Sequence, residues 1–318
     1  MTDNEDTPIY YDKAGRLRVS AIGKTMLSNK IVKKIKREFV AGISKVYIRY
    51  VKSTYFGLKI KIPLIYGMRN GGYIIPEEIF MSDCLRSFIS TKKGCVIDVG
   101  VNVGLYLVKL KAISSNINYY GVDPNPACTF YTQELIRLNS FKNAKLFTFA
   151  LGETKEILSF YASRLGDGTG SLIKEHQSHN NMEYSFDTIV LTGDSLVNVL
   201  QLKEDISVIK IDVEEAELYV LRGLEQTIKK YTPYIYIEIL FTTTQEQNNR
   251  AMKICEFLQN INYSIIGINR DTKKLEIIKD ISKVGKDYEQ EYIFSPDDFV
   301  ERFISSITKN NSGIEVKR

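Results

Sequence analysis

The chain has 318 residues, of which 44% are hydrophobic and 25% are charged, as in ordinary globular proteins, and its length allows one large domain or one domain with an extension. No stretch approaches the ~18 apolar residues that a membrane span requires. The net charge is only +5, yet residues 13–69 contain 15 Lys and Arg against one acid, Glu38. That imbalance concerns surface partners rather than the fold.

The cysteines and histidines exclude a zinc site of the usual kinds. Two histidines cannot form one alone, and the four cysteines are not at metal-ligand spacing: Cys84, Cys95, Cys128 and Cys255. Four free thiols favour a reducing compartment, and the acidic, polar first 13 residues do not resemble a secretory signal. We therefore expect a cytoplasmic protein.

Residues 1–93 are predicted to form an α+β extension, beginning with a loosely packed arm. Residues 24–45 predict a helix with an apolar residue at every fourth position and a basic opposite face. The basic face has three interpretations, in decreasing order of preference. The first is the solvated side of a helix that caps the main domain, the second is peripheral docking on an anionic membrane surface, and the third is binding of nucleic acid. Two strands, 46–51 and 58–66, and a helix over 76–90 follow.

The main domain, 94–303, is predicted to begin with a strand, a glycine turn and a helix. Residues 94–104 read GCVIDVGVNVG, with a short buried strand over 95–99 and an apolar helix after Gly104. Asp98 lies near the end of the strand, and Gly100, Asn102 and Gly104 form the turn. Such a unit cradles nucleotides in doubly wound folds, because glycine lets the backbone approach a ligand closely.

A second strand, 117–122, ends in Asp123, 23 residues after Gly100, and is followed by Pro124-Asn125-Pro126. An acid at this place in a strand–helix–strand unit faces the ribose hydroxyls of an adenosine ligand. The turn reads GxNxG and not GxGxxG, so nothing in it is arranged for a pyrophosphate. This favours S-adenosylmethionine over NAD as the ligand.

Strands and helices continue to alternate beyond Asp123, which predicts a doubly wound, mostly parallel α/β sheet. A glycine-rich loop is expected over 164–171, and a polar, disordered tail over 304–318. The remaining predicted strands are 144–151, 157–161, 184–192, 206–211, 233–240, 263–269 and 290–295, and the helices are 126–139, 194–202, 216–231 and 246–259.

Acidic residues gather where the predicted strands end. Asp98, Asp123, Asp212 and Glu214 all follow or close a strand, and Glu238 lies within the apolar run YIYIEIL. Because ligands bind at the carboxyl ends of parallel strands, these acids predict one site.

The sequence resembles the FkbM family of S-adenosylmethionine-dependent O-methyltransferases. The matching blocks occur in the family's order and span about 94–295: VIDVGVNVG at 96–104, DPNP at 123–126, LTGDSL at 191–196, VIKIDVEEAELYVLRGL at 208–224 and PYIYIEI at 233–239. The resemblance implies a class I Rossmann-like fold, with a seven-stranded, mostly parallel sheet whose last strand is antiparallel. The family usually has Glu where Asp123 stands and Gly where Glu215 stands, and the second change adds a charge beside the expected acceptor site.

The resemblance also implies roles for the site residues. Gly100, Asn102 and Gly104 would approach the methionine part of the donor, and Asp98 would also bind the cofactor. Asp123 would hold the ribose, and Pro124, Asn125, Ala150 and Leu151 would lie near the adenosine. Asp212 and Glu214 would face the acceptor.

Methyl transfer to a hydroxyl requires one group that accepts a proton. The candidates are Asp212 and Glu214, then Glu238 and His176. Asp212 and Glu214 are also candidate ligands for a divalent metal. Structural roles stay open: Asp212 as a helix cap, Glu238 as a buried partner of Lys210, and His176 and His179 as plain loop residues.

We therefore expect O-methylation of a glycan, a sugar or a related metabolite. Methylation of nucleic acid is disfavoured, because DVEE stands where base-modifying enzymes carry an Asn/Asp-Pro-Pro-aromatic motif. A non-catalytic nucleotide-binding module and an NAD-dependent dehydrogenase are further alternatives.

Overall fold

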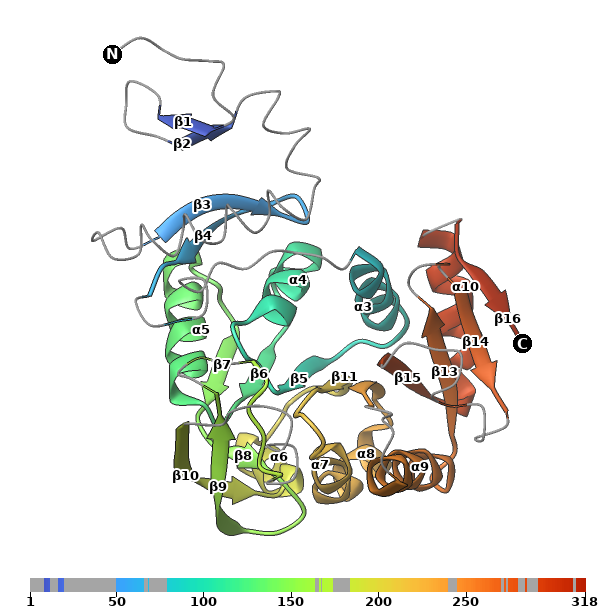
Figure 1. Cartoon of the computed structure of the whole chain (residues 1–318). Coiled ribbons are helices and arrows are strands. Elements are labelled where there is room, and N and C mark those ends of the chain that lie inside the picture. Colours follow the sequence, from blue (N-terminus) through green and yellow to red (C-terminus); the bar gives the residue numbers. More distant parts are fainter. Residues whose placement is uncertain are drawn as a thin grey trace.

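A computed structural model describes most of the chain and shows one large sheet between two layers of helices (Figure 1). The residues described are 9–11, 17–19, 50–65, 68, 79–163, 166, 168–173, 184–239, 245–269, 272, 274–279, 284, 291–310 and 313–318. The predicted basic helix over 24–45 and both histidines lie outside them.

The sheet has the order β16-β14-β13-β15-β12-β11-β5-β6-β7. Its parallel part runs through β12 (Tyr234–Glu238), β11 (Ile206–Ile211), β5 (Cys95–Val99), β6 (Tyr119–Val122) and β7 (Ala144–Phe147). β15 (Glu291–Pro296) is antiparallel to both of its neighbours, β12 and β13 (Tyr263–Asn269). The predicted class I Rossmann-like fold, with its last predicted strand antiparallel, is confirmed.

The sheet is wider than the seven strands predicted. β14 (Lys274–Ile278) pairs with β13, and β16 (Glu315–Lys317) pairs with β14 at the edge. β16 is only three residues long, too short for its hydrophobic pattern to distinguish it from loop.

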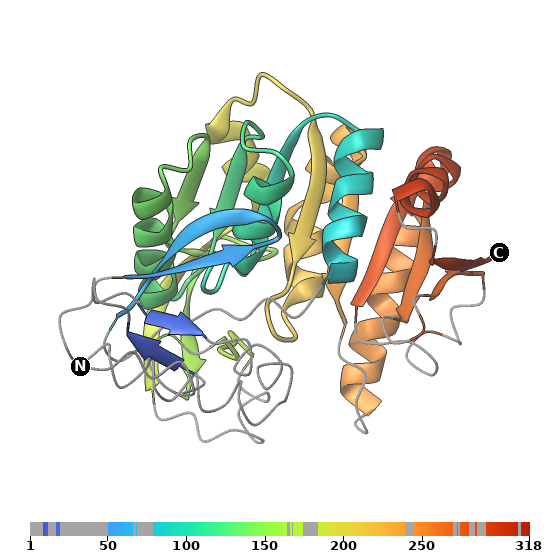
Figure 2. The ribbon, with the colours of Figure 1, turned by 90° about the horizontal axis from the view of Figure 1, so that it is seen from above.

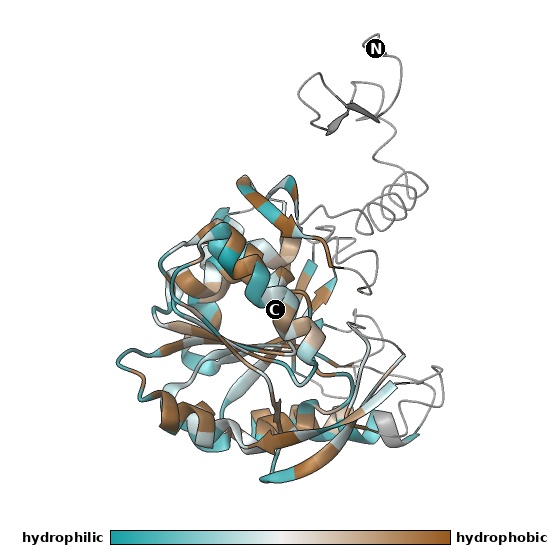
Figure 3. Ribbon diagram, turned by 90° about the vertical axis from the view of Figure 1, so that its left-hand side faces the viewer, coloured by the Kyte–Doolittle hydropathy of each residue, from teal (hydrophilic) through white to brown (hydrophobic). Residues whose placement is uncertain are grey.

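Helices cover both faces of the sheet (Figure 1). One face carries α3 (Ile79–Thr91), α4 (Leu105–Ile113), α5 (Pro126–Asn139) and α10 (Val300–Asn310), and the other carries α6 (Gly193–Leu200), α7 (Glu217–Gly223), α8 (Glu225–Tyr231) and α9 (Gln245–Gln259). Alternate residues of β11 serve the two cores, with Ile209 and Ile211 on the α6–α9 side and Val208 on the other. The helices combine hydrophobic and hydrophilic residues (Figure 3), and no helix in the described part of the chain is long and apolar enough to cross a membrane.

A hairpin of β3 (Tyr50–Tyr55) and β4 (Leu58–Pro63) lies outside α4 and α5 (Figure 2). Its inner residues, including Tyr55 and Ile62, pack against Val108 and Leu135 of those helices. The Asn139 side chain accepts from the Lys61 N–H at 2.7 Å and donates to the Lys61 carbonyl at 2.8 Å. The hairpin is therefore tied to the main domain. A further antiparallel pair, β1 (Ile9–Tyr11) and β2 (Leu17–Val19), precedes it.

The predicted strand over 144–151 is wrong as a single element. It divides into β7, at the edge of the main sheet, and β8 (Ala150–Leu151), which pairs with β10 (Tyr184–Leu191) in a separate sheet of order β8-β10-β9. The third strand of that sheet is β9 (Glu156–Ala162). The division brings Ala150 and Leu151 towards the end of β6.

The predicted helix over 216–231 also divides, into α7 and α8. Gly223 lies where they meet, and a Cβ atom there would be 1.9 Å from the Gly152 carbonyl oxygen. This close approach requires glycine, which is a poor residue for a helix interior.

The prediction of a disordered tail over 304–318 is wrong. α10 extends to Asn310, and its Phe303, Ile304 and Ile307 are buried. The Phe303 ring stacks on Phe88 of α3 at a centroid distance of 5.0 Å. Apolar residues separated by three and four positions give α10 one buried face, which a polar average composition conceals.

Phe303→Ala should lower the free energy of unfolding by about 3–5 kcal/mol, because it leaves a cavity beside Phe88. Ser305→Ala, on the exposed side of the same helix, is the matched control and should change it by less than about 0.5 kcal/mol. Urea denaturation measures both. Equal stability of the two variants would show that α10 does not belong to the folded unit.

Candidate active site

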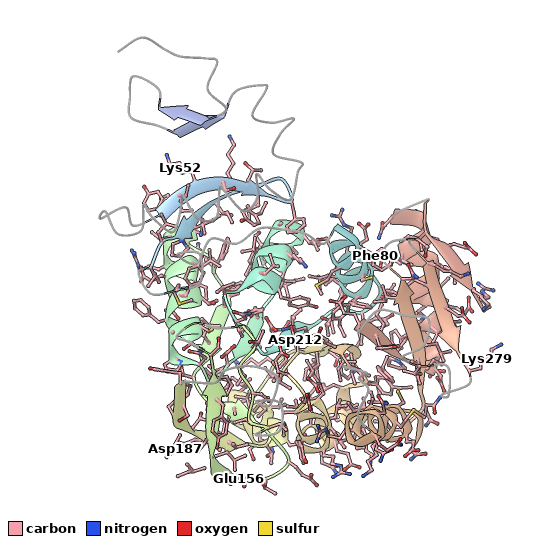
Figure 4. The ribbon with its side chains drawn as sticks, in the orientation of Figure 1. Lys52, Phe80, Glu156, Asp187, Asp212 and Lys279 are labelled. Atoms are coloured by element: carbon pink, nitrogen blue, oxygen red, sulfur yellow. The ribbon has the colours of Figure 1, made fainter. Side chains whose placement is uncertain are left out.

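A pocket lies at the carboxyl ends of β5, β6 and β11, the edge at which doubly wound sheets bind ligands. Its lining residues come from three strand ends, the second sheet and the glycine loop: Val99, Gly100, Asn102, Val122, Asp123, Pro124, Asn125, Cys128, Phe149, Ala150, Leu151, Phe160, Gly168, Gly170, Leu172, Asp212, Val213, Glu214 and Ala216. Asp212 lies near the centre of the molecule, whereas Lys52 is on the outer hairpin (Figure 4).

The glycine turn after β5 forms the floor of the pocket. Gly100 has φ +85°, and a Cβ atom there would be 1.8 Å from the backbone carbonyl oxygen of Asp212, so only glycine fits. Asn102 is also in the left-handed region, with φ 50°, and its carbonyl accepts from the Thr132 hydroxyl at 3.0 Å. The turn is thus held against both α5 and the end of β11.

Asp123 is buried at the end of β6 and is held by backbone donors. Its two carboxylate oxygens accept from the N–H groups of Asn102 at 2.7 Å and Asn125 at 2.8 Å. Each oxygen keeps a further lone pair for a ligand hydroxyl. Burial raises the pKa of Asp123 to about 6. The two backbone hydrogen bonds lower the pKa but do not offset the effect of burial. Asn125 has a second role, because its side chain caps α5 by accepting from the Ala127 N–H.

Three carboxylates gather across the pocket from Asp123. Oxygens of Asp212, Glu214 and Glu238 lie within 4.8 Å of one another. Burial, together with the nearby carboxylates of Asp212 and Glu214, raises the pKa of Glu238 to about 9, so Glu238 holds a proton at neutral pH. Only Asp212 and Glu214 line the pocket itself.

The turn that carries these acids has an unusual backbone. Glu214 and Glu215 have φ angles of 53° and 77°, in a region that side-chain-bearing residues rarely adopt. The buried Glu217 carboxylate accepts from the N–H groups of Val213 at 3.2 Å and Glu215 at 3.1 Å. The Ser171 hydroxyl, from the glycine loop, donates to the Glu214 carbonyl at 2.5 Å. Strained backbone that is fixed by its surroundings is typical of functional sites.

Glu215 does not add its charge to the acceptor side, contrary to the sequence-based expectation. Its side chain is buried and forms an ion pair with Arg250 of α9, at 2.5 Å, and it does not line the pocket. The departure from the family's usual glycine is therefore compensated by Arg250.

The structure separates some predicted site residues from the pocket. Asp98 is fully buried beneath it, where it accepts from the Tyr119 hydroxyl at 2.5 Å and pairs with Lys210 at 3.2 Å. Gly104 caps α4 with φ 77° and lies against Thr132. The sequence leaves pairing of Glu238 with Lys210 open, and the structure pairs Lys210 with Asp98 and Asp212 instead.

Sequence reasoning missed several contributors. Lys210, which the sequence offered only as a partner of Glu238, contacts both Gly100 and Asp212, and a lysine within the apolar run VIKI was the available signal. Phe149 and Phe160 also line the pocket. Phe160 comes from the second sheet, which no local pattern placed here.

The three acids also match the oxygen ligands that Mg²⁺ and Ca²⁺ prefer. Glu238 extends the predicted pair Asp212 and Glu214 to three. However, a cation would displace the proton of Glu238 and would lie near the Lys210 ammonium, 3.2 Å from Asp212. The three carboxylates are thus suitable ligands for a divalent cation by atom type. The proton on Glu238 and the nearby Lys210 charge disfavour its binding.

Arg250→Met should lower the free energy of unfolding by about 3 kcal/mol, because it removes the cation that faces the buried Glu215 carboxylate. The double variant Arg250→Met/Glu215→Gln removes the charge as well and should recover most of the loss. Urea denaturation of the two variants and the wild type checks this. A double variant no more stable than Arg250→Met would mean that the ion pair does not hold the turn.

Comparison with known proteins agrees with this architecture. The model of the Methyltransferase FkbM domain matches residues 98–265, just over half of the chain. "Methyltransferase 1" of Beauveria bassiana (strain ARSEF 2860) is 25% identical over 166 residues, covering 48% of this chain and 66% of that protein.

Two solved structures resemble the chain at low identity. The methyltransferase FkbM of Methylobacillus flagellatus KT is 14% identical, with a TM-score of 0.39, and the match covers 63% of this chain and 43% of that one. A Streptococcus mutans structure assigned as a methyltransferase, in complex with SAH, is 12% identical, with a TM-score of 0.36. The match covers 70% of this chain and 97% of that one. The chain thus spans less than two thirds of the first two relatives. Since the family model covers more than half of the chain and all three strand ends of the pocket, the chain belongs to the FkbM methyltransferase domain family.

Proposed function

We propose that the protein is an S-adenosylmethionine-dependent O-methyltransferase that modifies a hydroxyl of a glycan, a sugar or a related metabolite. One observation carries the proposal: a single pocket joins an adenosine-type site around Asp123 to a pair of carboxylates, Asp212 and Glu214. A methyl donor and a proton-releasing acceptor require these two halves side by side. Membership of the FkbM family supports the same reaction class.

The donor half fits S-adenosylmethionine by the chemistry of its residues. Asp123 accepts from the ribose hydroxyls, and the backbone of the Gly100–Asn102 turn lies along the methionine part. Phe149, Ala150 and Leu151 offer an apolar wall for the adenine. The donor supplies an electrophilic methyl group on its sulfonium, so no protein nucleophile is required.

The acceptor half aligns a hydroxyl and takes its proton. Asp212 and Glu214 line the pocket, and Glu238 lies next to them. Because Glu238 already holds a proton at neutral pH, the hydroxyl proton passes to Asp212 or Glu214 as the methyl arrives. Glu238 hydrogen-bonds and orients rather than accepts.

The same carboxylates disfavour nucleic acid as the acceptor. Proteins bind nucleic acid by neutralising its phosphates with Lys and Arg, whereas the pocket lining at Asp212 and Glu214 carries carboxylates. A neutral polyhydroxyl acceptor suits this surface better.

The function is tested by incubating the protein with S-adenosylmethionine labelled in its methyl group and a panel of acceptors. The panel contains free monosaccharides, methyl glycosides, sugar nucleotides and short RNA, and mass spectrometry locates any added methyl. O-methylation of a sugar supports the proposal. Binding of S-adenosylhomocysteine without transfer to any acceptor would favour a binding module, and methylated RNA would overturn the acceptor class.

Donor affinity should depend on pH through Asp123. Its pKa is raised to about 6, and it binds the ribose best as a carboxylate, so the affinity for S-adenosylhomocysteine should fall as the pH drops below about 6. Asp123→Asn should weaken binding by about 10- to 100-fold at pH 8 and remove this pH dependence. Calorimetry between pH 5 and 8 measures both effects. If Asp123→Asn binds like the wild type, the ribose is held elsewhere.

Asp212→Asn should lower turnover by about 10²–10⁴, the usual contribution of a general base, while donor affinity stays close to that of the wild type. Asp187→Asn, an exposed carboxylate on β10 (Figure 4), is the control and should keep full turnover. Steady-state kinetics with the best acceptor of the panel separates the two. If Asp212→Asn and Glu214→Gln stay active but His176→Ala does not, the base is His176 and the carboxylates only position the acceptor.

A further inference from the structure

The side chain of Lys210 is buried at the centre of the sheet. Lys210 lies in β11, between β5 and β12, and its register partners are Asp98 on one side and Tyr236 on the other. Its side chain is 7% exposed. A buried lysine is rare unless its charge is compensated.

The ammonium contacts one oxygen from each of three places. It donates to the Gly100 carbonyl at 2.6 Å and lies 3.2 Å from carboxylate oxygens of both Asp98 and Asp212. The ammonium therefore combines one hydrogen bond, to Gly100, with two ion pairs. Burial lowers the pKa of Lys210, but Asp212 and Asp98 outweigh it and leave the pKa above its usual range, so the side chain stays charged.

Only one of these contacts is needed to neutralise a buried cation. Asp98, fully buried in the adjacent strand, already provides a counter-charge. The other two contacts lead into the pocket, because Gly100 belongs to the donor turn and Asp212 to the acceptor side. The Asp212 side chain is 41% exposed and also faces Glu238, and Lys210 is the cation that it contacts.

We infer that Lys210 is a positioning residue that fixes the donor turn and the acceptor carboxylate relative to each other. This inference rests on the proposed function and explains how the donor half and the acceptor half of the pocket are aligned. The ammonium holds the Gly100 carbonyl and directs one oxygen of Asp212 inward, and the carboxylate keeps lone pairs for the acceptor hydroxyl. A misplacement of about 1 Å between reacting groups is enough to reduce a rate by about 10²-fold.

The experiment removes Lys210 in a background in which Asp98 carries no charge. Lys210→Met alone would leave the Asp98 carboxylate buried opposite a methyl group and could prevent folding. The informative pair is therefore Asp98→Asn and the double variant Asp98→Asn/Lys210→Met. In the first, Lys210 keeps Asp212 and the Gly100 carbonyl; in the second, the buried cation and its counter-charge are both absent. Circular dichroism and thermal melting check that each is folded.

We expect the double variant to bind S-adenosylhomocysteine about tenfold more weakly than Asp98→Asn by calorimetry, because the donor turn loses its tether. With the best sugar acceptor of the panel, kcat should fall at least about tenfold further, while KM for the acceptor changes little. A residue that only neutralised Asp98 would move neither quantity in this background.

Equal affinity and equal kcat in the two variants would overturn the inference and leave Lys210 as a structural counter-ion. That result would not affect the proposed function, which depends on the wild type. A wild-type protein that binds no S-adenosylhomocysteine would instead remove both proposals. A double variant that does not fold, beside a folded Asp98→Asn, would also contradict the inference, because it would make Lys210 essential for packing.

Discussion

The close approach between the β5–α4 turn and the end of β11 is the constraint on which the rest of the site depends. At Gly100 the two backbones are so near that a Cβ atom would be 1.8 Å from the Asp212 carbonyl oxygen. This contact brings the turn that we propose receives the donor next to the strand end that carries Asp212 and Glu214. Lys210 lies at the same point and bonds to both segments.

The acidic turn after β11 shows how the protein maintains an unfavourable local structure. Two consecutive glutamates adopt left-handed backbone conformations, each of which costs of order 1–3 kcal/mol. The Glu217 carboxylate, the Ser171 hydroxyl and the Glu215–Arg250 ion pair supply compensating contacts from three different elements. The gathered carboxylates are thereby held near one another despite their mutual repulsion, and Glu238 relieves part of it by keeping its proton.

The second sheet, of order β8-β10-β9, forms part of the pocket wall. Because the chain leaves the main sheet after β7, Ala150 and Leu151 cross to β10 and close one side of the pocket. The glycine loop that follows β9 covers another side, where Gly168 approaches the Asn102 side chain so closely that a Cβ atom would be 2.3 Å from it. The pocket is thus bounded by segments up to 117 positions apart in the chain, from Val99 to Ala216.

The sequence by itself determined the central elements and the carboxylates that line the candidate pocket. The strands β5, β11 and β13 and the helix α5 have the predicted bounds, because buried strands and capped helices carry strong local patterns. Asp123, Asp212 and Glu214 were placed at strand ends, and parallel strands necessarily bring such ends to one edge. These features follow from local periodicity and from the topology that alternation implies.

Tertiary structure alone decided the contacts between distant segments. The pairing of Lys210 with Asp98 and Asp212, the turning of Glu215 towards Arg250 and the addition of Glu238 to the carboxylate pair depend on which strands become neighbours. The packing of α10 likewise depends on residues distant in the chain, because Phe88 and Tyr234 cover its apolar face. Electrostatic and packing energies of this kind act between groups that are near in space and distant in the chain, so no local pattern contains them.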